Sequence, residues 1–385
     1  MNRMAISPRH DWREKVEELG LTYHTPGGQK YWDESAYYQL NAGEVDTLEK
    51  AGNELHAMCL QAAQMVIDED LFSLLGISTA AVPYVKNSWE RDDFSIYGRF
   101  DLAFDGQSPP KLLEYNADTP TALVEAAVAQ WYWLQDFNSH LDQFNSIHEK
   151  LVAAWKQFGA KAPGKIYFGG IKECLEDAQT VLYLEDTCHQ AGLPIGEMFI
   201  EDLGYDADKR QYVDLAGERV ENYFKLYPWE WMWHEEFAVS LKLEICHFLE
   251  PMWKMLLSNK GLLPILWRLF PNHPNLLPAF FTLEELETCW RATGRAGAGY
   301  VKKPRLSREG ANVTLVQGGS VAQATSGDYG EEGFVFQGLA SPGDFDGNHP
   351  VMGIWIVNHE ACGLGIREDT SLITGNCSRF VPHLF

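Results

Sequence analysis

The chain has 385 residues, of which 45% are hydrophobic and 13% aromatic, and its 54 acidic and 31 basic side chains give a formal net charge of −23. A chain so rich in aromatic residues is not a low-complexity disordered protein. The acidic balance excludes nucleic acid or an anionic membrane as the main partner, because both require clustered lysine and arginine. It is compatible with a cationic substrate such as a polyamine.

The seven cysteines are scattered along the chain, and no two of them are spaced as CxxC. Neither a disulfide framework nor a zinc site is indicated, and free thiols in a reducing compartment are the simplest interpretation. The first residues, MNRMAISPRHDWREK, are charged throughout and lack the apolar segment of a signal peptide. No apolar run is long enough to span a bilayer. We therefore expect a cytoplasmic protein that has no membrane contact.

The first third of the chain predicts a long helix and then a β-hairpin. Residues 44–75 place apolar side chains at helical spacing, as on the buried stripe of a core helix. Residues 97–116 indicate two strands, with the turn marked by Asp105-Gly106. Thr119-Pro120 predicts the start of a helix that runs to about Phe137. The N-terminus of that helix would follow the second strand directly, where it favours an anion.

The middle of the chain alternates strands with a helix, which predicts a small parallel α/β domain. We expect its strands over 165–169, 196–200 and 222–228 and its helix over 175–191. The last third predicts a helix over 262–270 and then a mostly antiparallel sheet with glycine- and asparagine-rich turns. We expect its strands over 300–305, 312–317, 333–338, 351–357 and 361–366.

The hairpin gathers charged and amide side chains on one face. Successive side chains of a strand point to opposite faces, so the first strand has a polar face and an apolar face. The polar face carries Arg99, Asp101, Ala103 and Asp105, and the apolar face carries Phe100, Leu102 and Phe104. On the second strand, Leu112, Glu114 and Asn116 share a face. We expect the two strands to pair in one register: Phe104 near Lys111, Asp101 opposite Glu114, and Arg99 opposite Asn116.

This register predicts a magnesium–phosphate site. Two carboxylates directly opposite each other in a sheet repel, and a hard cation between them offsets the repulsion. Carboxylate and amide oxygens suit Mg²⁺, which keeps waters and shares its shell with phosphates. The alternative is a solvated sheet face on which Arg99 is an ordinary cross-strand partner of the acids.

Basic side chains recur at three further places. Lys260 stands beside the start of the 262–270 helix, where the helix dipole disfavours a lysine, so a bound anion would account for it. Lys303 ends a strand ahead of the loop 307–312, whose glycine and small residues allow an anion nest; a plain turn is the alternative. Arg367 stands at a strand end, where a surface ion pair is the alternative.

Glu230 lies in an aromatic segment, Tyr227-Pro228-Trp229-Glu230-Trp231. A carboxylate in that setting can hold an amine by its charge, with cation–π contacts from the rings. The alternative is a paired acid in a tryptophan-rich core.

Five segments carry a family resemblance by their order and spacing. They are GRFD (98–101), EYNAD (114–118), SNKGLLPILWRLFPNHPNLL (258–277), VKKP with SREGAN (301–312) and GIRED (365–369). Together they resemble the synthetase module of the glutathionylspermidine synthase family, over about residues 12 to 380. The chain is more similar to the short, stand-alone bacterial members, labelled acid–amine ligases, than to the bifunctional enzymes. The amidase module of the latter, with its catalytic cysteine, has no room here.

The resemblance implies an ATP-grasp fold, in which ATP lies between two antiparallel-sheet subdomains, with a preceding small α/β (pre-ATP-grasp) domain. Mapped onto this chain, it gives helices and the metal-binding hairpin at 1–160, the small α/β domain at 161–257 and the C-terminal ATP-grasp subdomain at 258–385. The implied reaction is phosphorylation of a carboxylate by ATP, followed by attack of an amine that forms an amide. The implied cofactors are ATP and two Mg²⁺ ions, with glutathione and spermidine as the reference substrates.

The resemblance also implies roles for single residues. Asp101, Glu114 and Asn116 resemble the Mg²⁺ ligands, and Arg99 matches the arginine that stabilises charge in the acyl-phosphate step. Lys260 and Lys303 match lysines that hold the ATP phosphates. The hinge that touches the adenine is matched by Phe336, Gln337, Gly338 and Leu339. The substrate contacts are matched by Thr119, Glu230 and Arg367. We expect Ser307–Ala311 to be the lid that keeps water from the acyl phosphate.

One departure from the family leaves the substrates open. Only about twenty residues separate Glu230 from the EPMW segment at 250–253, where the bifunctional enzymes carry a longer insertion. A ligase for a different acid and amine is therefore one alternative. A non-catalytic ATP-binding regulatory protein and a purely structural acidic protein are the others. The intact set of metal ligands, lysines and Arg99 argues against a mere binding protein, and a purely structural protein predicts no Mg²⁺-dependent nucleotide binding.

Overall fold

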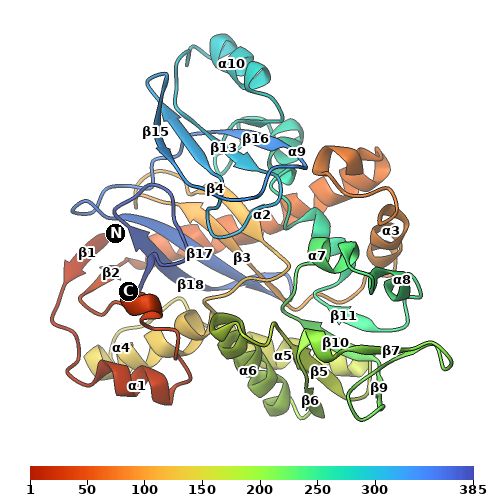
Figure 1. The fold of residues 1–385 in the computed structure, drawn as a ribbon. Coiled ribbons are helices and arrows are strands. Elements are labelled where there is room, and N and C mark those ends of the chain that lie inside the picture. The colour runs from red at the N-terminus through yellow and green to blue at the C-terminus, as the bar shows by residue number, and fades with distance from the viewer.

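The computed structural model describes residues 1–385 and shows a mixed α/β fold built around a five-stranded antiparallel sheet, the central sheet (Figure 1). Its strand order is β19-β18-β17-β3-β4. The hairpin from the first third of the chain is thus continuous with strands from the last third, through β3 and β17. The five strands are β3 (Tyr97–Ala103), β4 (Lys111–Asn116), β17 (His349–Val357), β18 (Glu360–Asp369) and β19 (Arg379–Val381).

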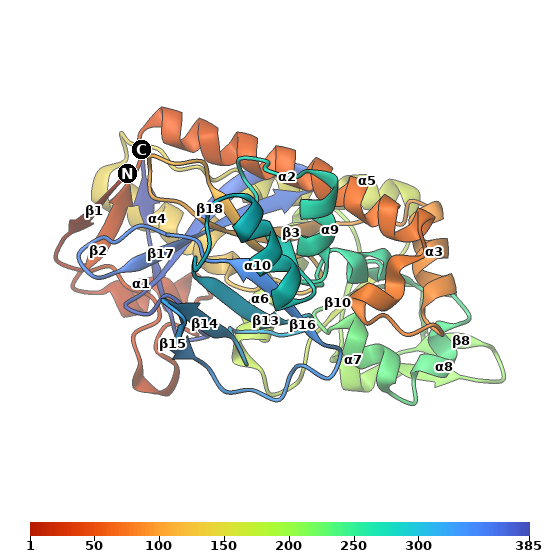
Figure 2. The same cartoon turned by 90° about the horizontal axis from the view of Figure 1, so that it is seen from above.

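The two faces of β3 differ as the alternation predicts. Phe100, Leu102 and Phe104 are buried in the largest hydrophobic core, together with the apolar side of α2 (Ala42–Asp68). Figure 2 shows α2 as a long helix running beside α9 (Leu262–Leu269), and it also packs on β17 and β18. The opposite face of β3 therefore carries Arg99 and Asp101 away from this core.

Across its charged face the hairpin pairs as expected, with Arg99 opposite Asn116 and Asp101 opposite Glu114. The register then shifts by one residue, because Leu113 forms a β-bulge that has no partner on β3.

Towards the turn, the expected pairing of Phe104 near Lys111 is therefore wrong: Lys111 faces Ala103. The bulge has a structural consequence, since the Leu113 carbonyl accepts a hydrogen bond from Lys303 of a second sheet.

This second sheet, the upper sheet, lies above the β4 edge of the central sheet in Figure 1. It is antiparallel, in the order β12-β16-β13-β14-β15. Its strands are β12 (Ala279–Phe280), β13 (Tyr300–Pro304), β14 (Thr314–Gln317), β15 (Ser320–Ala324) and β16 (Phe334–Gly338). The antiparallel strands expected in the last third are present, but they divide between two sheets, with α10 (Leu283–Ala292) covering the upper one.

A parallel sheet of four strands lies beside the central sheet, in the order β11-β10-β5-β6. It confirms the strand–helix–strand pattern predicted for the middle of the chain. The strand expected over 196–200 is shorter, because residues 200–202 turn into a 3₁₀ helix. The elements are β5 (Ile166–Gly169), α6 (Leu175–Gln190), β6 (Ile195–Glu197), β10 (Asn222–Lys225) and β11 (His247–Leu249).

Two expected helices have different limits. The helix expected from Thr119-Pro120 begins only at Leu123, because Ala122 takes a left-handed conformation with φ of 66°. Its first turns widen into a π-helix at residues 125–129 before α4 (Gln130–Asn138). No helix N-terminus therefore directly follows β4. The long helix expected over 44–75 ends at Asp68 and is followed by a separate 3₁₀ helix at 71–75.

The remaining elements surround these sheets. The N- and C-terminal strands pair through β2 in a small sheet, which places the two chain ends near each other in Figure 1. No helix is long and apolar enough to cross a membrane. The elements are β1 (Asn2–Ala5), α1 (Trp12–Glu18), β2 (Ala36–Gln39), α3 (Val82–Glu90), α5 (Ile147–Lys161), β7 (Gly204–Asp206), β8 (Gln211–Val213), β9 (Arg219–Val220), α7 (Trp229–His234), α8 (Ala238–Leu241) and β20 (His383–Leu384).

Candidate active site

A cavity of about 600 Å³ lies between the central sheet, the upper sheet and the start of α6. Most of the residues singled out in the sequence line it, although they come from distant parts of the chain. They are Arg99, Asp101, Glu114, Asn116, Thr119, Lys260, Lys303, Gln337, Gly338, Leu339 and Arg367. Two do not line it: Phe336 lies on the other side of β16, near the Tyr300 ring, and Glu230 reaches the cavity only through Arg308.

Arg99 lies at the floor of the cavity, with only 8% of its surface exposed. Its Nε lies 2.7 Å from Asp101 Oδ1, and its Nη1 donates to the Thr121 carbonyl at 2.7 Å. Burial opposes the charge of Arg99, but Asp101 raises the pKa of the guanidinium above its ordinary value. The side chain crosses Gly353 on β17, where a Cβ would lie 3.1 Å from Arg99 Cδ. A glycine there leaves room for the extended arginine.

Asp101, Glu114 and Asn116 form a compact group of polar side chains. Asn116 Nδ2 lies 3.4 Å from Asp101 Oδ2 and 3.2 Å from Glu114 Oε1, so its amide bridges the two carboxylates. A rotation of the amide by half a turn presents its oxygen to the same point. Two carboxylates and an amide oxygen are the hard ligands that Mg²⁺ takes, with water and phosphate completing its octahedral shell. The residues present therefore fit a magnesium ion.

Two lysines from different elements converge on this group. Lys260 Nζ lies 3.1 Å from Glu114 Oε2 and donates to the Ser307 carbonyl at 2.8 Å. Lys260 precedes α9 by two residues, where the helix dipole disfavours a positive charge. The negative charge of Glu114 offsets this unfavourable interaction. Burial acts to raise the pKa of Glu114, but Lys260 and Lys303 outweigh it and lower the pKa to about 2.

Lys303 joins the upper sheet to the hairpin. Its Nζ donates to the Leu113 carbonyl at 3.1 Å and to Gln337 Oε1 at 2.9 Å. Gln337 in turn donates to the Leu112 carbonyl at 2.9 Å. Burial lowers the pKa of Lys303 to about 8, although the Glu114 carboxylate acts in the opposite direction. Lys303 thus keeps an ammonium group in the cavity at neutral pH.

Arg308 is a site residue whose contacts the sequence does not reveal. It belongs to the loop 307–311 and donates to Thr119 Oγ1, and its Nη2 lies 3.4 Å from Glu230 Oε1. The only signal was its place in the SREGAN segment. Arg308 therefore brings together two side chains that were predicted separately as substrate contacts.

Several polar atoms around the cavity have no hydrogen-bond partner. They are the Ser307 hydroxyl and the Nε groups of Arg308 and Arg367. Arg367 Nη2 donates to the carbonyls of Gly375 and Asn376, which directs the side chain along the cavity wall. Buried polar atoms are nearly always paired in folded proteins. These donors are therefore suited to an anionic ligand.

The start of α6 adds acidic side chains to the opposite wall. Glu173, Glu176 and Asp177 line the cavity beside the Trp231 ring. Burial raises the pKa of Asp177 to about 6. The sequence did not single out these residues, because Glu176 and Asp177 fall in the ordinary acidic first turn of a predicted helix and Glu173 lies just before it. The cavity is thus lined by side chains of both signs, and the charge of Arg308 acts on Asp177.

The sequence matches the profile described as "Glutathionylspermidine synthase preATP-grasp" over residues 3–385. It is 40% identical over 400 residues to a Haemophilus influenzae protein named "Putative acid--amine ligase", and 100% of both chains is covered. It is 30% identical to trypanothione synthetase of Crithidia fasciculata, over 86% of this chain and 53% of that protein. It is 29% identical to the bifunctional glutathionylspermidine synthetase/amidase of Escherichia coli, over 96% and 63% respectively. The chain spans less than two thirds of these last two proteins.

Among solved structures, a glutathione synthetase-like effector from Globodera pallida superposes with a TM-score of 0.56 at 10% identity, with 98% of both chains covered. This likeness concerns the fold alone. The relatives in sequence are named as ligases and synthetases, which confirms the expected class of enzyme. The match over residues 3–385 shows that the chain belongs to the glutathionylspermidine synthase family.

Proposed function

We propose that the protein is an ATP- and Mg²⁺-dependent carboxylate–amine ligase with an ATP-grasp arrangement, and that it forms an amide through an acyl phosphate. One observation carries the proposal: two carboxylates, an amide, two lysines and an arginine meet at a single cavity, from both antiparallel sheets and from the residues before α9. Phosphoryl transfer depends on positioning and charge neutralisation more than on covalent chemistry. This set of side chains supplies both.

The metal ligands in this proposal are Asp101, Glu114 and Asn116. We propose two ions, because a pair of metal ions stabilises both the attacking and the leaving oxygen of an in-line transfer. When bound, Mg²⁺ would neutralise charge on the nucleotide phosphates. Each of the two carboxylates also lies beside a cationic side chain, Asp101 beside Arg99 and Glu114 beside Lys260.

The basic residues take distinct roles. Lys260 and Lys303 hold the nucleotide phosphates from two sides, and the hinge formed by Phe336, Gln337, Gly338 and Leu339 holds the adenine. Arg99, fixed between Asp101 and Gly353, faces the carboxylate being phosphorylated and stabilises the developing charge. The loop Ser307–Ala311 excludes water, because an acyl phosphate hydrolyses readily. The bond between Lys260 and the Ser307 carbonyl supports a coupling of this loop to the phosphate site.

The charged side chains of the cavity suit two substrates of opposite charge. Arg308 and Arg367, with Thr119, suit the acid. Glu230 and the acidic start of α6 suit a protonated amine before it reacts. The reference pair is glutathione and spermidine, because the family and the Escherichia coli relative are named for their conjugate. The seven free cysteines fit a reducing compartment, and we place the enzyme in the cytoplasm.

Release of ADP from Mg-ATP tests this proposal. The reaction is run with glutathione and spermidine, with each alone, and with a panel of other small acids and polyamines. Release that needs both glutathione and spermidine is the expected result. ADP release with another acid and amine would support the ligase activity and show that its substrates are different. Tight ATP binding without ADP release from any pair would overturn the ligase in favour of a regulatory binding protein.

A further inference from the structure

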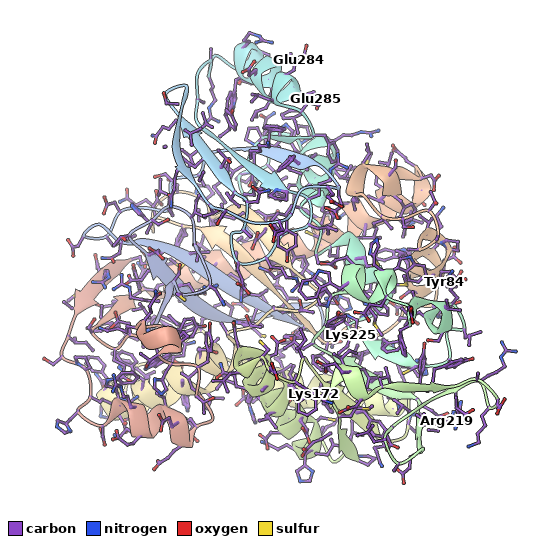
Figure 3. The ribbon with its side chains drawn as sticks, viewed as in Figure 1. Tyr84, Lys172, Arg219, Lys225, Glu284 and Glu285 are labelled. Carbon is purple, nitrogen blue, oxygen red and sulfur yellow. The ribbon has the colours of Figure 1, made fainter.

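A fully buried ion pair joins the end of the hairpin to the parallel sheet. Lys225 ends β10 and is 0% exposed, and Asp118 follows β4 by two residues and is 1% exposed. Lys225 Nζ lies 2.7 Å from Asp118 Oδ1. Figure 3 shows Lys225 inside the molecule, where the parallel sheet meets the central sheet. Because the removal of two charges from water costs much of what the pair gains, its position calls for a reason other than stability.

The pair fixes the first turn of α7. Asp118 Oδ2 accepts a hydrogen bond from the backbone N–H of Trp229 at 3.0 Å. Lys225 Nζ also donates to the Tyr227 carbonyl at 2.9 Å and lies 4.6 Å from the centre of the Trp229 ring. All the contacts of the two charged groups thus connect the end of β4 with the start of α7.

The neighbours of these residues along the chain are substrate residues of the proposed function. Thr119 follows Asp118, and Glu230 follows Trp229. Arg308 contacts both Thr119 and Glu230 from the loop above. The buried pair on one side and Arg308 on the other therefore close a ring around the two substrate side chains.

A second buried lysine provides a contrast. Lys254 Nζ lies 3.3 Å from Glu250 and donates to the carbonyls of Tyr97 and Ala117 at 2.9 and 3.0 Å. It holds the two hairpin strands together but makes no bond to α7. The pair of Lys225 and Asp118, by contrast, bonds directly to the backbone N–H of Trp229, the residue before Glu230.

We propose that Asp118 and Lys225 are positioning residues for the acid–amine half of the reaction, an inference that rests on the proposed function. The pair sets the distance between Thr119 and Glu230 and so holds Arg308 over the co-substrates. It has no contact with the phosphate lysines or the adenine hinge. Its loss therefore affects the use of acid and amine and leaves ATP binding unchanged.

The decisive variant carries Asp118→Asn and Lys225→Met together. The single change Lys225→Met leaves the buried Asp118 carboxylate without its counter-charge and is expected to lower the unfolding temperature. The double change removes both charges and is expected to recover much of the lost stability. The matched control is Thr187→Val, which deletes a buried hydroxyl that accepts from Trp155 Nε1 in the same part of the fold. The control touches neither residue of the pair.

Two readouts separate positioning from stability. The first readout is hydrogen exchange of two backbone amides at the Arg308 loop: Ala311, which donates to the Arg308 carbonyl, and Asn312, which donates to the Ser326 carbonyl. Exchange of both is expected to be at least about tenfold faster in the double variant than in wild type or the control. The KM for the acid or the amine is expected to rise at least about tenfold, with the KM for ATP changed less than twofold. Wild-type exchange and KM values in a double variant that melts like wild type would overturn the proposal.

The exchange measurement needs no turnover, so it decides the role of the pair even if no acid and amine support ADP release and the proposed function fails. If the double variant does not fold, Asp118→Asn alone serves the same comparison, because the amide keeps the size and the acceptor oxygen for the Trp229 N–H. Faster exchange in the Arg308 loop then supports the inference, and unchanged exchange contradicts it.

Discussion

If Lys303 binds the nucleotide phosphates as proposed, nucleotide binding is expected to depend on pH in a range where most lysines are fully charged. Its pKa of about 8 results from burial, which Glu114 only partly offsets. Above that pH the side chain of Lys303 is mostly uncharged, so the affinity for the nucleotide is expected to fall on the alkaline side. Affinity falls tenfold for each pH unit above the pKa, and from pH 7 to 9.5 the expected loss is about 30-fold. An ammonium 4 Å from a phosphate charge contributes up to about 4 kcal/mol at an effective dielectric constant near 20, so the attraction is large enough for this loss.

Calorimetric titration with Mg²⁺ and a non-hydrolysable ATP analogue measures this effect without interference from the amine substrate, which must itself lose a proton to react. Lys303→Arg keeps a charge at every pH of the series, so its affinity is expected to stay level to pH 9.5. Lys303→Met is expected to bind weakly and independently of pH. A wild-type affinity that stays level to pH 9.5, or an equal fall in Lys303→Arg, would refute the assignment.

Other residues of the site give further predictions. Asp101→Asn is expected to raise the Mg²⁺ concentration for half-maximal activity at least about tenfold, with an unchanged circular dichroism spectrum; an unchanged Mg²⁺ requirement would contradict the metal role. Arg99→Lys should lower kcat by roughly 10²–10³ and spare the KM for ATP, and an equal loss in ATP affinity would reassign it to ground-state binding. Gly353→Ala should displace Arg99 and lower kcat roughly 10- to 100-fold, whereas wild-type kcat would show that the close approach is unimportant. The depressed pKa of Glu114 contributes roughly 3 kcal/mol to the free energy of unfolding above pH 4.5, and this contribution is lost as the pH falls towards 2. The free energies of unfolding of wild type and Glu114→Gln, measured with denaturant, should therefore converge at low pH. A difference that stays constant with pH would argue against the pairing of Glu114 with the lysines.

The charged core of the hairpin is readable from the sequence because strand alternation is strict. Arg99 and Asp101 fall on one face of β3 whatever the surroundings, and the structure pairs them with Asn116 and Glu114 as expected. The bulge at Leu113 is not readable, since nothing in a leucine marks it. Its carbonyl contacts Lys303, which is far away in the sequence.

Buried charges are likewise visible only in three dimensions. In the sequence, Lys225 ends an ordinary strand, and its place beside Asp118 depends on how the parallel sheet packs on the hairpin. Arg308 belongs to a loop of glycine and small residues, so its contacts with Thr119 and Glu230 could not be derived from spacing. The start of the helix after β4 was misplaced because the left-handed turn at Ala122 has no glycine to announce it.

The most direct test of the central claim follows one oxygen atom. The acid that supports ADP release is labelled with ¹⁸O in its carboxyl group and incubated with Mg-ATP, the amine and the enzyme, and the released phosphate is analysed by mass spectrometry. Transfer through an acyl phosphate leaves one carboxylate oxygen on the phosphate, so the account predicts one ¹⁸O atom in each phosphate formed with amide. Unlabelled phosphate accompanying amide formation would contradict it.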